Sequence, residues 1–177
     1  MTACSSGATA VGFARDLIAC GAASVMIAGG VEPLSRTTYA TFNALQAVDP
    51  EYCKPFDRNR QGLSLGEASA FLILESLTHA LKRNTRIYGE VLGYGITCDA
   101  HHMTAPDPEG SGAVRSIRAA LKDADLLHAA VDYICAHSTA TPANDAMEAK
   151  AILEVFGKDI TRIPVSSIKS MTGHTLG

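Results

Sequence analysis

The chain begins with TACSSGATAVGFARDLIACG, residues 2–21, in which Cys4 stands among small residues directly before an apolar helical pattern. This pattern predicts a helix from about Cys4 to Cys20, with Gly21 as its stop signal. The first N–H groups of a helix lack partners within the helix, and the helix dipole is positive at that end. We therefore expect the Cys4 thiol to have a lowered pKa and to act as a nucleophile. The alternative is that Cys4 is a small buried apolar residue, as most free cysteines are.

Length, charge and cysteine content exclude several classes of protein. The 177 residues suffice for one domain with a hydrophobic core. The formal net charge of −3 gives no electrostatic case for a nucleic acid or an anionic membrane as partner. No apolar run reaches the roughly 20 residues that cross a bilayer, and no signal peptide is recognisable. The five cysteines are odd in number and scattered, which indicates reduced thiols in a cytoplasmic protein.

Apolar runs alternate with helical patterns along the chain, which predicts an α/β fold with mixed or parallel sheets. Two short runs predict buried strands, at 24–32 and 68–76. A longer strand with glycines that indicate bending or close backbone approach is predicted at 86–97, and further strands at 131–137 and 162–169. Helices are predicted at about 37–47, 77–82, 114–124 and 144–156, and polar loops at 54–62 and 101–112.

Two further stretches place reactive side chains where a strand ends. His137 follows an apolar strand in ICAHSTATPANDAMEAKAI, residues 134–152, and Lys169 and His174 follow another in VSSIKSMTGHTLG, residues 165–177. In open α/β sheets the reacting groups gather beyond the carboxyl ends of the strands. Taken singly, His137 fits a loop hydrogen bond and Lys169 a solvated surface. Taken together, Cys4, His137 and His174 point to one shared pocket.

Five segments carry a resemblance to a known family: TACSSGA, AASVMIAGG, KPFDRNRQGLSLGEA, CAHSTATPAND and SSIKSMTGHTLG. In this order and spacing they resemble the β-ketoacyl-acyl-carrier-protein synthases, the elongating type of the thiolase superfamily. The resemblance implies a thiolase-like layered αβαβα fold with mixed five-stranded sheets. Residues 1–177 would be the central part of that domain, from the end of its N-terminal half to the start of its C-terminal half. We therefore expect the 177 residues alone to be inactive.

The resemblance also implies catalytic roles. Cys4 resembles the nucleophile that accepts an acyl chain from an acyl-carrier-protein thioester. His137 and His174 resemble the pair that promotes decarboxylation of a malonyl thioester and stabilises the enolate oxygen, and Lys169 resembles the lysine that supports their electrostatics. The implied reaction is a decarboxylative Claisen condensation in the biosynthesis of fatty acids or of related polyketides or polyenes.

Substrate-binding residues and departures from the family pattern follow from the same comparison. Thr139 and Thr141 resemble the threonines that hydrogen-bond the pantetheine arm, and Phe42 is expected to line the acyl pocket unless it is a plain core residue. Ser138 stands where the family usually has glycine, so the loop there is expected to differ slightly. Leu63 replaces a phenylalanine that often sits close to the site.

The implied partner is an acyl carrier protein, and the implied assembly is a homodimer or a ketosynthase heterodimer. No cofactor is expected beyond the phosphopantetheine that the carrier protein holds, and no metal is required. Neither nucleic acid nor a membrane is expected as a partner. The basic residues that could form a docking patch are Arg58, Arg60, Lys82 and Arg83, although scattered surface charge is the simpler and favoured interpretation.

Three alternatives remain open at this level. A non-catalytic chain-length-type partner subunit resembles these enzymes but usually lacks the nucleophilic cysteine. A thiolase would be expected to carry a second cysteine, and an initiating synthase a Cys-His-Asn set. A metal-binding protein could use Cys98 with His101 and His102, or Cys135 with His137, but these spacings miss the paired pattern of structural zinc sites.

Overall fold

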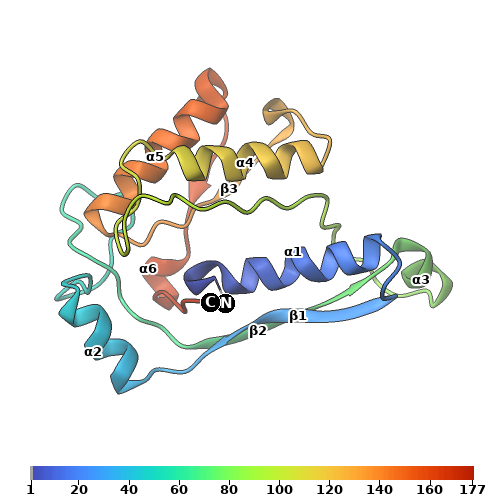
Figure 1. The fold of residues 1–177 in the computed structure, drawn as a ribbon, viewed down its shortest axis with the longest axis horizontal. Coiled ribbons are helices and arrows are strands. Elements are labelled where there is room, and N and C mark those ends of the chain that lie inside the picture. The colour runs from blue at the N-terminus through green and yellow to red at the C-terminus, as the bar shows by residue number, and fades with distance from the viewer. Residues whose placement is uncertain (1) are drawn as a thin grey trace.

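The computed structural model describes residues 2–177 as a mixed α/β chain (Figure 1). Its first stretch contains a 3-10 turn (Ala3–Ser5), α1 (Ser6–Ala19), β1 (Val25–Glu32), α2 (Arg36–Ala44), β2 (Ala68–Glu75) and α3 (Leu77–Lys82). Its second stretch contains α4 (Ser111–Asp123), a 3-10 turn (His128–Ala130), β3 (Ile134–Cys135), α5 (Pro142–Phe156), a 3-10 turn (Gly157–Thr161), β4 (Val165–Ser166) and α6 (Lys169–Thr172). The predicted helices are confirmed to within a few residues, and all predicted strands except one are present.

Strands β1 and β2 form an antiparallel pair with α1 along one face (Figure 1). Side chains alternate between the two faces of a strand. Ala28 is buried, whereas the cross-strand neighbours Ile27 and Ile73 are 70% and 66% exposed. The prediction that both strands are buried is therefore wrong for these residues. An apolar run indicates a strand that could be buried on both faces, but α1 covers only one face of the β1–β2 sheet.

The second stretch has its own small core. Strands β3 and β4 pair in parallel and α5 connects them, while α4 packs against α5. The buried apolar residues of this core are Val114, Ala151, Ile152, Val155, Phe156 and Ile163. The described residues thus form one antiparallel and one parallel two-stranded sheet, in place of the five-stranded sheets expected for a complete fold.

Residues 86–97 do not form the predicted strand. A strand needs a neighbouring strand for its backbone hydrogen bonds, and this segment instead runs between α1 and α4 (Figure 1). A β-carbon on Gly12 would lie 2.3 Å from the Tyr94 ring, and one on Gly95 would lie 2.2 Å from the backbone carbonyl oxygen of Ser116. The glycines therefore mark close backbone approach, as expected, although not within a sheet.

The last residues of the chain lie against the beginning of α1 and the middle of β1 (Figure 1). A β-carbon on Gly30 would lie 2.2 Å from the carbonyl oxygen of Gly177, and one on Gly7 would lie 3.3 Å from its carbonyl carbon. Position 30 thus needs glycine for the backbones to approach this closely, and position 7 leaves little space for a larger residue. This contact brings the segment that carries His174 next to the turn that carries Cys4.

Candidate functional site

Cys4 lies in the 3-10 turn that leads into α1. The turn is closed by a bond of 3.2 Å from Ser5 N to Thr2 O and by one of 2.7 Å from Ser6 Oγ to Ala3 O. Ala3 has φ of 49°, a backbone conformation that costs free energy for a residue with a β-carbon. The tight turn therefore holds the thiol at the start of the helix.

Burial sets the protonation state of Cys4. Desolvation raises the pKa of the thiol, and the backbone hydrogen bond and the Lys169 charge oppose this shift without overcoming it. The lowered pKa expected from the sequence is therefore wrong in this structure, because burial disfavours the thiolate more than its surroundings favour it. Cys4 is a thiol at neutral pH, and it needs a proton acceptor when it acts as a nucleophile.

His137 lies in the loop between β3 and α5, and the carboxylate of Glu148 holds this loop. Glu148 Oε1 accepts a hydrogen bond from His137 N at 2.6 Å, and Oε2 accepts one from Ser138 N at 2.7 Å. Ser138 and Ala140 have φ of 39° and 63°. Ser138 thus adopts a conformation that glycine adopts at lower cost, and its Oγ donates to Ala136 O at 3.2 Å.

A second carboxylate of α5, Asp145, fixes the same loop from within. Asp145 is 2% exposed and accepts hydrogen bonds from Ala140 N at 3.1 Å and from Phe56 N at 2.7 Å. The Arg60 guanidinium lies 3.7 Å from it. The sequence analysis missed both carboxylates, although Asp145 and Glu148 are three residues apart and so share one face of the helix. That spacing, just after the His137 loop, is the signal that could have identified them.

His174 follows α6 and pairs with residues near the start of β2. Its N–H donates to Ser64 O at 2.6 Å, and its C=O accepts from Gly66 N at 3.0 Å. Leu176 N donates to the ring atom Nδ1 at 3.2 Å. Because Nδ1 accepts, the neutral ring carries its proton on Nε2. Nε2 is buried and has no hydrogen-bond partner among residues 2–177, so its N–H is free to donate to a bound molecule.

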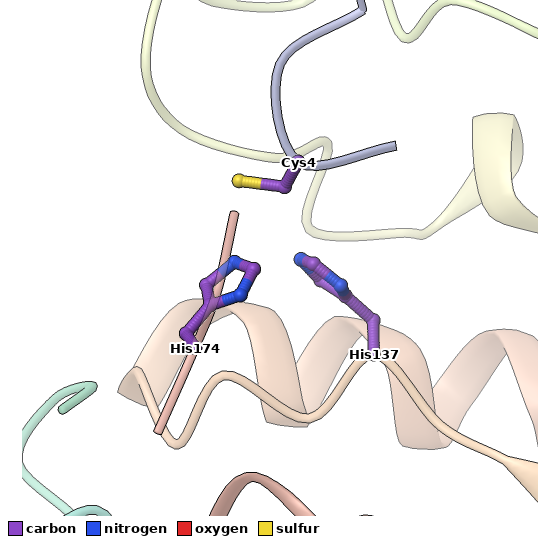
Figure 2. A group of neighbouring side chains, drawn as sticks. All are labelled: Cys4, His137 and His174. Carbon is purple, nitrogen blue, oxygen red and sulfur yellow. The ribbon is translucent and has the colours of Figure 1, made fainter. Parts of the chain in front are cut away.

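The structure brings the three predicted reactive side chains together (Figure 2). The Cys4 sulfur and one ring nitrogen from each of His137 and His174 lie within 4.8 Å of one another. The two rings meet edge to face, with centroids 5.3 Å apart and an interplanar angle of 84°. Figure 2 shows both imidazole rings pointing toward the thiol from the same side. A small group bound between them would contact all three.

Burial also keeps both imidazoles neutral. Burial lowers the pKa of His174 to about 3, and the charges of His137 and Lys169 add to the effect. Burial of the His137 ring, together with Lys169, lowers its pKa as well, while Glu148 and Asp145 oppose the shift. His137 as a whole residue is nevertheless exposed. At physiological pH the site therefore offers two neutral rings.

Lys169 begins α6, and its ammonium group acts electrostatically on all three members of the cluster. Its carbonyl oxygen accepts a hydrogen bond from the Cys53 thiol at 3.0 Å. Cys53 is 2% exposed, and its hydrogen bond holds the first residue of α6 in place. Nothing in the sequence around Cys53 predicts this hydrogen bond to Lys169, because Cys53 is a single thiol in a polar segment.

The predicted substrate-binding residues lie in two places. Thr139 is nearly buried in the His137 loop, and its Oγ1 lies 2.9 Å from Oγ1 of Thr141, the residue before α5. Phe42 is half-buried on α2 and takes no part in the cluster of Cys4 and the two histidines. Their contacts with substrate stay predictions.

The metal sites considered from the sequence do not form. Cys98, His101 and His102 line an open hollow of about 650 Å³, but they do not converge as a group of three potential ligands within the described part of the chain. Cys135 likewise does not join His137 in such a group. The group that does converge is Cys4 with the two histidines.

Two of the four basic residues considered for a docking patch make contacts within the chain. Arg83 pairs with Glu75, and Arg60 donates to Pro142 O at 2.9 Å. These contacts favour the simpler interpretation of scattered charge for both arginines. None of the helices in residues 2–177 combines the length and the apolar character needed to cross a membrane.

A thiol that faces two neutral imidazoles on an α/β scaffold defines a class of protein with a cysteine–histidine–histidine site. Residues 1–80 match the N-terminal domain of β-ketoacyl synthases, and residues 88–177 match their C-terminal domain. The chain belongs to the β-ketoacyl synthase family.

Full-length relatives are similar along the whole chain. The 3-oxoacyl-[acyl-carrier-protein] synthase 2 of Synechocystis sp. is 50% identical over 184 residues, which cover 100% of this chain and 44% of that protein. The enzyme of the same name from Coxiella burnetii is 45% identical over 184 residues, with the same coverage of 100% and 44%. The chain thus spans less than half the length of these relatives.

Solved structures of ketosynthases share the fold. A β-ketoacyl synthase from Burkholderia phymatum is 41% identical with a TM-score of 0.93, over 99% of this chain and 43% of that one. The ishigamide ketosynthase/chain length factor is 42% identical with a TM-score of 0.93, over 100% and 43%. A type II polyketide synthase ketosynthase, solved with its acyl-carrier protein and bound to the hexaketide, is 39% identical with a TM-score of 0.94, over 99% and 45%. The predicted thiolase-like α/β fold class is confirmed.

Proposed function

We propose that the protein carrying this chain is an elongating β-ketoacyl-acyl-carrier-protein synthase. It joins an acyl group held on Cys4 to the two-carbon unit of malonyl-acyl-carrier protein, in the biosynthesis of fatty acids or of related polyketides or polyenes. The observation that carries the proposal is the convergence of the Cys4 sulfur with nitrogens of His137 and His174 within 4.8 Å. The presence of all three groups argues against a non-catalytic chain-length-type subunit, and His174 argues against a thiolase or an initiating synthase.

The first step transfers the acyl chain to sulfur. Cys4 is protonated at neutral pH because burial raises its pKa, so a neighbouring base takes the proton as sulfur attacks the thioester carbon. His174 cannot take it at Nε2, because that atom already carries hydrogen while Nδ1 accepts from Leu176 N. His137 is the remaining neutral imidazole and serves as the base. It then returns the proton to the departing pantetheine thiolate, which balances the step.

The second step generates the carbon nucleophile. The ring proton of His137 first moves, by exchange with solvent, to the nitrogen that faces the site. The malonyl carboxylate then leaves as CO₂, and its bonding electrons form an enolate whose oxygen receives N–H bonds from His174 Nε2 and from His137. Donors that are fixed in place stabilise charge that appears only in the transition state. The enolate carbon attacks the acyl carbonyl, and the Cys4–carbonyl bond breaks to release the β-ketoacyl product and the Cys4 thiolate, which takes up a proton from solvent. Covalent storage on sulfur divides the reaction into two simpler ones.

The other predicted residues support this chemistry. Burial is the main reason why both imidazoles are neutral, and the Lys169 charge adds to it by disfavouring a second cation nearby. Thr139 and Thr141 present neighbouring hydroxyl groups beside His137 and are proposed to bind the pantetheine arm. Phe42 is proposed to line the acyl pocket.

The family and its relatives support the wider context. We infer that residues 1–177 are the central part of a ketosynthase domain, which an acyl carrier protein supplies with substrate. The protein acts in the cytoplasm as a homodimer or as a ketosynthase heterodimer. It needs no cofactor of its own, because the carrier protein brings phosphopantetheine.

A reconstituted condensation tests the proposal. The whole protein that carries this chain is incubated with acyl-acyl-carrier protein and malonyl-acyl-carrier protein, and the β-ketoacyl product is measured by mass spectrometry. We expect product from the wild type, none from Cys4→Ala, and full activity from Cys135→Ala, in which an exposed cysteine outside the cluster is removed. Undiminished product from Cys4→Ala would refute the assignment.

A further inference from the structure

The cluster of Cys4, His137 and His174 has the composition of a metal site as well as that of a condensing site. The three potential ligand atoms, one sulfur and two imidazole nitrogens, lie within 4.8 Å of one another and come from three separate segments (Figure 2). Zinc in catalytic sites commonly takes three cysteine and histidine ligands and leaves its fourth position open. Tetrahedral zinc brings its ligand atoms to about 3.5 Å from one another, so the side chains need to close by no more than about 1.3 Å.

A second observation points to a ligand at the same place. His174 is 3% exposed, and its Nε2 faces the cluster without any hydrogen-bond partner among the residues that the structure describes. Buried polar atoms are nearly always satisfied, and an unsatisfied one calls for an explanation. A substrate oxygen satisfies this atom during turnover. Because Nε2 carries a hydrogen, a cation can bind there only after the ring proton has moved from Nε2 to Nδ1.

We propose that Cys4, His137 and His174 together bind one Zn²⁺ ion, which holds the protein in an inhibited form. On binding, the Cys4 S–H bond breaks, its proton goes to solvent, and sulfur coordinates the metal. The ring proton of His174 moves from Nε2 to Nδ1, so the hydrogen bond of 3.2 Å from Leu176 N is lost. No oxidation or reduction takes place. The metal binding itself does not depend on the condensation, whereas the inhibition rests on the proposed function.

The metal-bound and the working states exclude each other. Zinc uses the sulfur that would carry the acyl chain, and it uses the Nε2 lone pair that is absent while Nε2 carries its proton. The Lys169 charge repels a cation here, and the loss of the Leu176 hydrogen bond costs further free energy. The binding is therefore weaker than in a dedicated structural zinc site and can be reversed by a chelator.

Cobalt is the probe that tests this proposal, because tetrahedral Co²⁺ with a thiolate ligand has intense visible bands and a charge-transfer band in the near ultraviolet. The chelator-treated protein is titrated with Co²⁺ without any acyl substrate, and Zn²⁺ is then added to displace it. We expect one equivalent to give the tetrahedral spectrum, Cys4→Ser to lose the charge-transfer band, and His174→Gln to weaken Co²⁺ binding at least about tenfold.

The matched control is Cys98→Ser, which removes an exposed thiol beside His101 and His102 and should leave the spectrum unchanged. A band that survives in Cys4→Ser, or disappears in Cys98→Ser, would overturn the proposal by placing the metal elsewhere. An octahedral spectrum without thiolate bands would also overturn it. The readout is optical and needs no turnover, so failure of the condensation assay and failure of the metal proposal are distinguishable.

Discussion

Replacing Glu148 by glutamine tests how the His137 loop is held. The two carboxylate oxygens accept from the N–H groups of His137 and Ser138 at 2.6 and 2.7 Å. In Glu148→Gln one N–H faces an NH₂ group and loses its partner. A hydrogen bond to a charged group contributes about 1.5–3 kcal/mol, and the surviving bond falls to the neutral range of about 0.5–1.5 kcal/mol. We expect a loss of about 2.5–4.5 kcal/mol in the free energy of unfolding.

The assay is urea denaturation followed by circular dichroism, with Glu154→Gln as the matched control. Glu154 lies on the same helix, but it is exposed and, among residues 2–177, pairs only with the exposed Arg118 at 3.2 Å. An exposed pair of this kind contributes about 0–1 kcal/mol. Equal effects of the two substitutions would refute the claim that the Glu148 carboxylate holds the loop.

Three further substitutions probe the approach of His174, the anchoring of α1 and the buried imidazole. Gly66→Ala should lower the free energy of unfolding by about 1–3 kcal/mol in chemical denaturation, because its β-carbon would lie 2.1 Å from a backbone oxygen of α6. The control Gly89→Ala should have no such effect, because no atom lies within 4 Å of its β-carbon. Tyr94→Phe removes the hydrogen bond of 3.0 Å from the Tyr94 hydroxyl to Thr9 of α1 and should lower the free energy of unfolding by about 1 kcal/mol in the same assay. The control Tyr88→Phe should leave it unchanged, because Tyr88 is 87% exposed. The pKa of His174 is near its ordinary value in the unfolded chain but about 3 in the folded one. The free energy of unfolding should therefore fall as the pH drops from 6.5 towards 3, by up to about 1.4 kcal/mol per pH unit. An identical pH slope in His174→Gln would contradict this.

The local part of the fold could be predicted from the sequence. Helix 77–82 has the predicted limits, and Gly21 follows the end of α1 with a positive φ of 78°. These features depend on residues within one or two turns of each other. The three reactive side chains could also be identified, because each stands at a recognisable boundary between elements.

The part that depends on distant segments could not be predicted. Residues 86–97 have strand composition, but whether a strand forms depends on a neighbour that the sequence of the segment does not specify. The pKa of Cys4 was predicted with the wrong sign because desolvation comes from chain that folds over it, including the segment of His174. Glu148 and Asp145 act on backbone N–H groups across the start of α5, and such contacts leave no trace in hydrophobic periodicity.

Locating the acyl group after a single transfer tests the central claim most directly. The protein is mixed with acyl-acyl-carrier protein in the absence of malonyl-acyl-carrier protein, digested, and mapped by mass spectrometry. The acyl group should reside on the peptide that contains Cys4, and it should be released as β-ketoacyl product when malonyl-acyl-carrier protein is added. An acyl group found on Cys53, Cys98 or Cys135, or a protein that never becomes acylated, would contradict the account.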